Sequence, residues 1–401
     1  MACRSLDVMT NRGSVTLFRV RGVPIRAHWT LLLVLPWIAW VFSLQFAQVA
    51  VVAGVDPSRV ILAPWVWGLL LAMALFACVA VHEVAHTLVA LRGGGKVREI
   101  TLMLLGGISQ IERIPQRRGL EAEVAAAGPL VSLALAGLLY VLYDMFPARF
   151  DDARLGLFFL SELNLVLGLF NLLPAFPLDG GRILRGLLEG PLGRARATRI
   201  AASLGMGLAV LMGLTGIFTG SFLLVLIGIF VYAGARQEAS VEVTREFLDR
   251  VRVADLMIHT VPTIDVHTAL AEAPRRMREL GRLELVVTDE VNRPIGLLTA
   301  ALLRELTPFQ RSFLRVQDIL DKVRSAAVFA HWRDRASDAF ARADEANADY
   351  VVVVDPDLEG GPGLVGLLTR SDVELSRALH ELEGVAPDSG PFLGARRPQE
   401  G

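Results

Sequence analysis

The sequence is poor in the residues that build disulfide-stabilised or nucleic-acid-binding proteins. Its 401 residues include two cysteines, Cys3 and Cys78, which excludes a disulfide framework. Basic and acidic side chains nearly balance at a formal net charge of −1, so nothing in the composition favours nucleic acid as a partner. The first 28 residues contain five arginines but no compact apolar core, and we therefore do not expect a secretory signal peptide.

Apolar residues, in contrast, are in excess. They make up 53% of the chain, against about 45–50% in soluble domains, and nearly all long apolar runs lie before residue 236. A helix needs about 20 such residues to cross a bilayer. The qualifying runs lie near residues 29–53, 62–91, 124–146, 155–176, 197–217 and 219–235. The last two nearly merge, so five spans are also defensible, but we predict six.

The distribution of Arg and Lys orients these spans. With the N-terminus in the cytoplasm, the inside segments carry 16 basic residues, whereas the outside loops carry three, Arg59, Arg149 and Arg154. Short cytoplasmic loops are enriched in basic residues. We therefore expect a multi-pass protein of the cell membrane with the N-terminus in the cytoplasm and, after six spans, the C-terminal half there too.

Residues 241–382 have the pattern of a soluble α/β module. Their apolar runs shorten to the length of strands, and an amphipathic stretch precedes each pair of runs. The order helix, strand, turn, strand, helix occurs twice with a period of about 63 residues, beginning at VRVADLM (251–257) and LRVQDIL (314–320). The predicted divisions are a membrane domain at 1–240, two repeats at 241–310 and 311–382, and a disordered tail at 383–401.

The run HEVAH at 82–86 is the first candidate for chemistry. In a helix, His82 and His86 lie one turn apart on one face, so both imidazoles can bind one ion. Glu83 can reach the same space and take a proton from a zinc-bound water. The pattern also arises by chance in soluble helices. Here the motif lies inside an apolar span, where an unpaired charged group costs at least ~2.5 kcal/mol. A bound metal would compensate the charge of these side chains.

Two histidines leave a zinc site short of a ligand, and Asp179 is the acid near the end of the fourth predicted span. The second and fourth spans cross in the same direction, so His82, His86 and Asp179 fall at similar depth near the cytoplasmic side. Two prolines and two glycines in NLLPAFPLDGGR (171–182) favour an unwound stretch. Such a stretch is tolerated only where it is buried in protein or lines a cavity. The alternative is a helix that ends at the membrane surface, with Asp179 solvated.

An HExxH motif in one span and NxxPxxPLDG in a later one resemble the site-2 protease family of intramembrane metalloproteases. The similarity covers residues 15–236 and includes RGVPIRAHW (21–29), LLGGISQI (104–111) and AAGPLVS (126–132). It implies His82, His86 and Asp179 as the ligands of one Zn²⁺ per chain. It also implies Glu83 as the general base and Asn171 as an oxyanion stabiliser, although a helix-packing amide is the alternative for Asn171.

Three further features go with this resemblance. Residues 104–111 suggest a short membrane-associated β-hairpin that could pair with an extended substrate. Ser132 stands where many relatives carry Asn, which leaves a polar packing role open at that position. His28, alone at the entry of a span, is expected to have an interfacial structural role.

The repeated half resembles a tandem pair of cystathionine-β-synthase (CBS) domains, through its V-x-D-[LI] openings and its strands that close on Gly-[LI]-[LI]-Thr. Such pairs often bind adenine nucleotides, with Thr/Ser-x-x-Asp at the ribose. The second repeat has this pattern as Thr369 and Asp372, whereas the first has Leu302 three residues after Thr299. The resemblance implies either one site for ATP or AMP or a dimerisation scaffold, and both alternatives stay open.

These features together predict a polytopic α-helical membrane protease followed by a cytoplasmic α/β CBS pair. The implied activity is regulated intramembrane proteolysis of a transmembrane protein, such as an anti-sigma factor, a sigma-factor precursor or a similar regulator. Membrane lipid and a second copy, joined through the CBS domains, are the other expected partners. A CBS-regulated transporter or channel is the alternative, but it needs no hydrolytic water. An inactive scaffold would not need all four catalytic-type residues.

Overall fold

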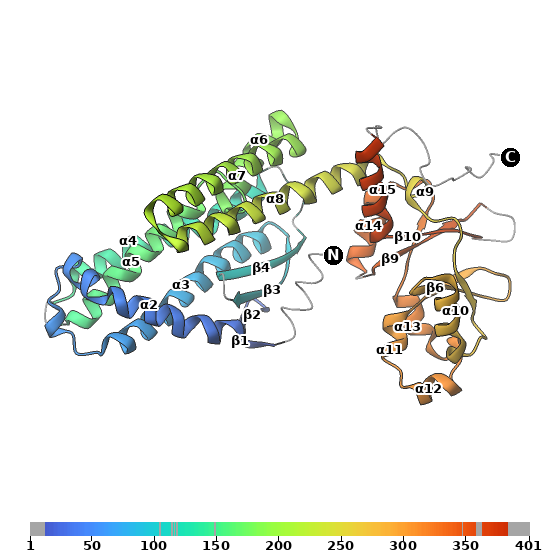
Figure 1. Ribbon diagram of the computed structural model, residues 1–401, viewed down its shortest axis with the longest axis horizontal. Coiled ribbons are helices and arrows are strands. Elements are labelled where there is room, and N and C mark those ends of the chain that lie inside the picture. The colour runs from blue at the N-terminus through green and yellow to red at the C-terminus, as the bar shows by residue number, and fades with distance from the viewer. Residues whose placement is uncertain are drawn as a thin grey trace. The chain divides into compact units, whose positions relative to one another are not determined.

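The computed structural model describes residues 13–103, 106–113, 115, 117, 119–147, 150–346, 348–357 and 363–383. The chain divides into two compact units, residues 1–240 and 241–401 (Figure 1). Apart from residue 383, the predicted tail lies outside the described residues.

Six long apolar helices build the first unit and confirm the predicted spans. They are α2 (Thr30–Val52), α3 (Pro64–Arg92), α4 (Leu120–Met145), α5 (Asp151–Asn171), α7 (Arg194–Thr219) and α8 (Phe222–Arg250). Each has the length and composition to cross a membrane. The shorter elements between them are the 3₁₀ turn η1 (Pro57–Arg59) and the amphipathic helix α6 (Asp179–Leu192). Helix α8 runs past its predicted end at residue 235 because residues 235–250 contain no Gly or Pro that would stop it.

Aromatic and small residues pack these helices together. Phe42 of α2 meets Phe159 of α5 edge to face at 5.1 Å between ring centroids, and Phe46 meets Trp67 of α3 at 5.4 Å. Such edge-to-face pairs are favoured over flat stacking. Gly68 of α3 lies directly against the backbone of α2, where the carbonyl of Ala39 leaves no room for a side chain. Close packing of α2 on α3 therefore depends on this glycine.

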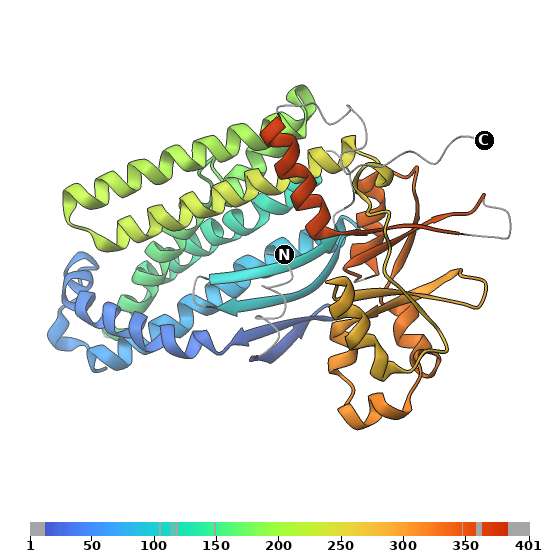
Figure 2. The same ribbon diagram turned by 45° about the vertical axis from the view of Figure 1, so that its right-hand side comes forward.

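A four-stranded sheet lies along α3 in the first unit (Figure 2). Its strands are β1 (Ser14–Val20), β2 (Val23–His28), β3 (Lys96–Met103) and β4 (Gly106–Arg113), in that order. The β3–β4 hairpin confirms the predicted one, although its residues 104 and 105 lie outside the described ones. The β1–β2 hairpin was not predicted. Among the described residues β4 pairs with β3 alone, so β4 is an edge strand.

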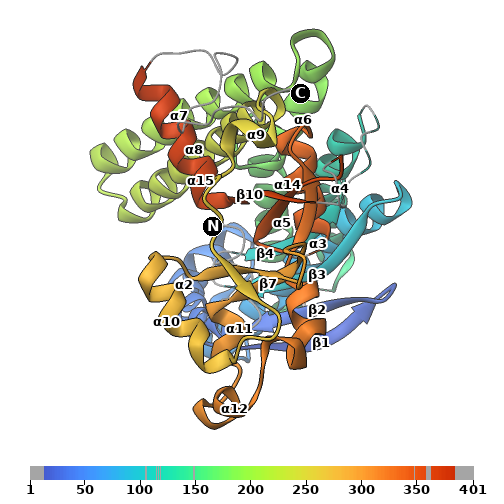
Figure 3. The ribbon, with the colours of Figure 1, turned by 90° about the vertical axis from the view of Figure 1, so that its right-hand side faces the viewer.

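The second unit contains two copies of a small mixed sheet (Figure 3). The first copy comprises α9 (Val253–Leu256), β5 (Thr263–Asp265), η2 (Leu270–Glu272), α10 (Ala273–Leu280), β6 (Glu284–Thr288), β7 (Pro294–Thr299), α11 (Ala300–Arg304) and α12 (Pro308–Phe313). The second comprises η3 (Val316–Ile319), α13 (Leu320–Ser325), β8 (Val328–His331), α14 (Ala336–Glu345), β9 (Tyr350–Asp355), β10 (Gly363–Thr369) and α15 (Arg370–Glu383). The predicted α/β repeat is confirmed. Strands β5 and β8, which pair in parallel with β6 and β9, were not predicted because they are short.

The two repeats exchange their opening segments. Val253 and Leu256, which open the first repeat, lie in a core with Phe340 of the second. Conversely, Val316, which opens the second repeat, lies in a core with Leu285 of the first. A boundary between residues 310 and 311 therefore divides the sequence repeat, whereas each packed core draws on both copies.

Replacing Gly68 by alanine tests the packing of α2 on α3. The added methyl group would meet the carbonyl oxygen of Ala39, and overpacking of this kind costs about 1–3 kcal/mol. We expect a lower melting temperature in detergent. Gly137→Ala on α4 is the matched control because its new methyl group would enter open space. Equal melting temperatures for the two variants would contradict this account.

Candidate metal centre

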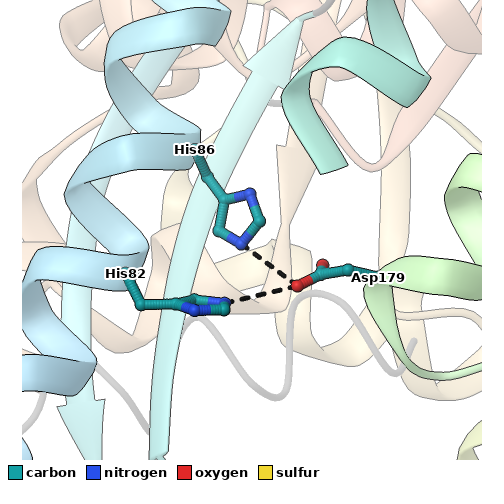
Figure 4. Close-up of side chains that lie close together, drawn as sticks. All are labelled: His82, His86 and Asp179. Carbon is teal, nitrogen blue, oxygen red and sulfur yellow. Dashed lines mark hydrogen bonds and ion pairs between the residues drawn. The ribbon is translucent and has the colours of Figure 1, made fainter. Parts of the chain in front are cut away.

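Three predicted ligands meet between α3 and the start of α6. The carboxylate oxygen Oδ2 of Asp179 lies 3.3 Å from Nε2 of His82 and 3.2 Å from Nε2 of His86 (Figure 4). Both histidines are buried, and the Asp179 side chain is 18% exposed. The structure thus brings Asp179 to one point with two imidazoles that lie more than 90 residues earlier in the chain.

Each imidazole is oriented through its other nitrogen. His86 Nδ1 lies 2.7 Å from the carbonyl oxygen of Val124, which can only accept, so Nδ1 carries a proton. His82 Nδ1 lies 2.9 Å from the hydroxyl of Ser132. Histidines that bind metals are held in this way. The polar role left open for Ser132 is therefore a hydrogen bond to a predicted metal ligand.

The donor set and the space around it fit a zinc ion. A neutral His86 that donates from Nδ1 has only a lone pair on Nε2, and this lone pair faces the Asp179 carboxylate. A second proton or a cation must therefore lie between them. Ligand atoms of a tetrahedral zinc site are about 3.3 Å apart, which matches the two distances. Gly128 keeps the space open, since a Cβ there would meet the Nε2 atoms of both histidines.

The chain between α5 and α6 delivers Asp179 to this point. Helix α5 ends at Asn171, residues 172–178 are not helical, and α6 begins at Asp179 itself. Side chains at Gly180 and Gly181 would collide with the backbone of this segment, so the two glycines allow it to fold back against α6. The alternative of a solvated Asp179 at a helix end is wrong, because the carboxylate is largely buried and turned toward α3.

Glu83 lies beside the cluster and is held by the sheet. The hydroxyl of Ser109 on β4 donates to Oε2 of Glu83 at 2.7 Å. Gly107, also on β4, gives the Glu83 side chain the space that a Cβ would fill. The sequence did not identify Ser109 as a functional residue. The sequence offers one weak indication of its role. Ser109 lies two residues after Gly107, so both residues lie on the same face of the strand.

Two other predicted residues lie outside the three-ligand cluster. The Asn171 amide donates to the carbonyl of Leu167 at 3.0 Å, one turn earlier in α5, and its oxyanion role stays a prediction. His28 ends β2, with Nδ1 at 2.9 Å from the hydroxyl of Thr30 at the start of α2. That position at the junction of a strand and a span is compatible with the expected structural role of His28.

In the second unit, Thr369 and Asp372 lie together at the start of α15. Oδ2 of Asp372 accepts from the Thr369 backbone at 3.0 Å and from its hydroxyl at 2.7 Å. Oδ1 faces Arg282 at 4.0 Å, and Arg282 also lies 3.5 Å from Glu284. Burial raises the pKa of the Glu284 carboxyl despite this arginine, and Asp372 acts in the same sense. Arg282 of the first repeat thus lies between Glu284 and the Asp372 of the predicted ribose-binding pair.

A second group of metal-type side chains, His331, Asp355 and Asp357, also lies in this unit. His331 Nδ1 accepts a hydrogen bond from the backbone of Arg333 at 3.0 Å, so the neutral ring carries its proton on Nε2. Asp355 already accepts from Trp332 Nε1 at 3.1 Å and from the backbone of Asp357 at 3.0 Å. These bonds account for the group without a metal.

Comparison with known proteins relates both units to known families. The family model for peptidase family M50 matches residues 70–149 and 148–214, and the CBS domain model matches residues 253–306. A zinc metalloprotease of Methanocaldococcus jannaschii is 34% identical over 64% of this chain and 71% of its own length. Rip3 of Mycobacterium tuberculosis, which also bears a zinc metalloprotease name, is 32% identical over 77% of this chain and 80% of its own.

A solved structure, the site-2 protease from Methanocaldococcus jannaschii, is 35% identical; the match covers 56% of this chain and 95% of that one, with a TM-score of 0.40. The zinc metalloprotease of Methanocaldococcus jannaschii and Rip3 are each more than 30% identical to this chain, and the matches cover more than two thirds of their lengths. The chain therefore belongs to peptidase family M50, the site-2 protease family of zinc metalloproteases, and carries a CBS region after its protease unit.

Proposed function

We propose that this multi-pass zinc metalloprotease cleaves a transmembrane segment of a regulatory membrane protein. The observation that supports the proposal is the place of the ligands. His82 and His86 are buried on a helix with the composition of a membrane span, and Asp179 reaches them from the first turn of α6, just after the non-helical residues 172–178. A peptide bond presented there would come from a chain that is itself in the membrane.

The chemistry divides between the metal and this chain's own side chains. A bound zinc ion lowers the pKa of water to about 7 and so supplies a nucleophile at neutral pH. Glu83 is the base that accepts a proton at its carboxylate and returns it to the leaving amine. The hydrogen bond from Ser109 engages Oε2 of Glu83 and leaves Oε1 for the proton.

The edge strand β4 is the proposed place for the substrate backbone. Among the described residues it pairs with β3 on one side alone, and it carries Ser109 and Gly107, which both lie against Glu83. An extended peptide could add to this edge through main-chain hydrogen bonds. A transmembrane helix would have to unwind for this, which exposes the bond to be cut.

The charge distribution and the second unit support a proposed location and proposed partners. The basic residues of the short loops support an N-terminus and a CBS pair in the cytoplasm. Cleavage near that side would release a cytoplasmic fragment. An anti-sigma factor, a sigma-factor precursor or a similar regulator is therefore the proposed substrate, and a homodimer through the CBS pair is the proposed assembly. The CBS pair is proposed to bind ATP or AMP at Thr369 and Asp372.

Glu83→Gln tests the proposed function. The variant loses its base but keeps the size of the side chain, so we expect cleavage of a model membrane substrate to fall by about 100-fold or more. Zinc content should stay at the wild-type level, because Glu83 is not a proposed ligand. Metal analysis and a cleavage assay on the same preparation measure both. Undiminished cleavage would overturn the mechanism, and wild-type protein without zinc would overturn the site.

Ser109→Ala tests the support of the base. Loss of the hydrogen bond to Oε2 should lower kcat by about 10-fold, equivalent to about 1.4 kcal/mol, with little change in KM or zinc content. Ser109→Thr retains a hydroxyl at the same position and is the control that should recover most of the rate. A rise in KM with an unchanged kcat would instead assign Ser109 to substrate binding.

Asp372→Asn tests the nucleotide proposal by calorimetry with ATP and AMP. The amide keeps an oxygen for the bonds to Thr369 but removes the charge, so affinity should fall by about 10-fold. Asp338→Asn, in the first turn of α14, is the control on another helix of the same repeat. Equal affinities for the three proteins would exclude Asp372 from the site, and no binding to wild type would favour the scaffold alternative.

A further inference from the structure

The non-helical segment that leads to Asp179, residues 172–178, packs against α7 and α8. Phe176, three residues before Asp179, is fully buried among Ala201 and Ala202 of α7 and Ala235 of α8. Its backbone N–H donates to the carbonyl of Ala201 at 3.2 Å. Because this segment has left the helical hydrogen-bond pattern, its position depends on the helices packed against it.

Two glycines allow α7 and α8 to approach this closely. A Cβ at Gly205 of α7 would strike the carbonyl oxygen of Phe176. A Cβ at Gly234 of α8 would lie 2.6 Å from Cγ of Pro177. The backbone of α8 is therefore in direct contact with the residue two positions before the metal ligand.

Ion pairs add a second connection one turn further along α8. Glu238 lies 3.5 Å from Arg182 and 3.6 Å from Arg185, both on α6, the helix that begins with Asp179. The Arg185 side chain is 8% exposed, also pairs with Glu121 of α4, and stacks on the Phe176 ring at 4.9 Å. A buried guanidinium must have its charge compensated. Arg185 thus ties α6 to α4, to α8 and to the ligand segment.

We propose that Glu238 is a positioning residue for Asp179, acting through Arg185 and Arg182, so that zinc affinity depends on α8. This helix continues unbroken to Arg250, and its Phe247 enters a core of the second unit. The inference rests on the proposed role of Asp179 as a zinc ligand.

The test uses the full-length protein in detergent, stripped of metal with a chelator and titrated with Zn²⁺. We expect Glu238→Gln to weaken zinc binding about 10-fold, as loss of a residue that supports a metal ligand does. Titration with Co²⁺ should give a visible absorption spectrum that differs from the wild-type one, because Asp179 is displaced. Glu246→Gln is the matched control, since it removes an acid from the same helix that pairs with Arg250 instead of α6.

A second variant separates positioning from general stability. Gly234→Ala leaves every charge in place but adds a methyl group that would collide with Pro177. This variant should also weaken zinc binding and alter the cobalt spectrum. Gly207→Ala on α7 is its control, because the new methyl group meets nothing within 4 Å. Wild-type affinity and spectrum in both Glu238→Gln and Gly234→Ala would overturn the inference alone. A wild-type protein that binds no zinc would overturn the proposed metal site together with it.

Discussion

Two imidazoles and a carboxylate lie among apolar helices, and this polar cluster must be compensated from within the protein. Unpaired charge at such a place is costly, yet His82, His86 and Asp179 come from two separate segments. A single cation would satisfy all three at once. The segment after α5 has to leave the helix to deliver Asp179, and the helices around it have to make room. Much of the first unit can be understood as a consequence of that requirement.

The supporting contacts divide between two sides of the site. From α4 come the Val124 carbonyl and the Ser132 hydroxyl, which fix the two imidazoles, and Gly128, which keeps the space between them open. From the sheet comes Ser109, which donates a hydrogen bond to Glu83, the proposed base. The predicted ligands and the proposed base are thus positioned by different elements. A change in β4, the proposed place of the substrate, can therefore alter Glu83 without displacing His82, His86 or Asp179.

The sequence predicted the strongly patterned features and missed those that depend on close contact. Six apolar runs predicted the six long helices, and HEVAH and the PLDG segment predicted the three side chains that the structure brings together, because bilayer thickness and zinc chemistry constrain such patterns tightly. The β1–β2 hairpin and Ser109 were missed, since short strands and single hydroxyls have no distinctive pattern. The exchange of openings between the CBS repeats was also missed. Val253 and Val316 occupy equivalent places in the repeat, and no periodicity shows in which core each is buried.

Helix α8 continues beyond its apolar stretch without a break as far as Arg250. Residues 235–250 contain no Gly or Pro, so Glu238 lies within a regular stretch of helix. Glu238 is bound to α6, and α6 begins at Asp179. If Glu238 positions Asp179 as proposed, zinc binding and the packing of α8 against α6 stabilise each other, because both favour the same arrangement of the ligand segment.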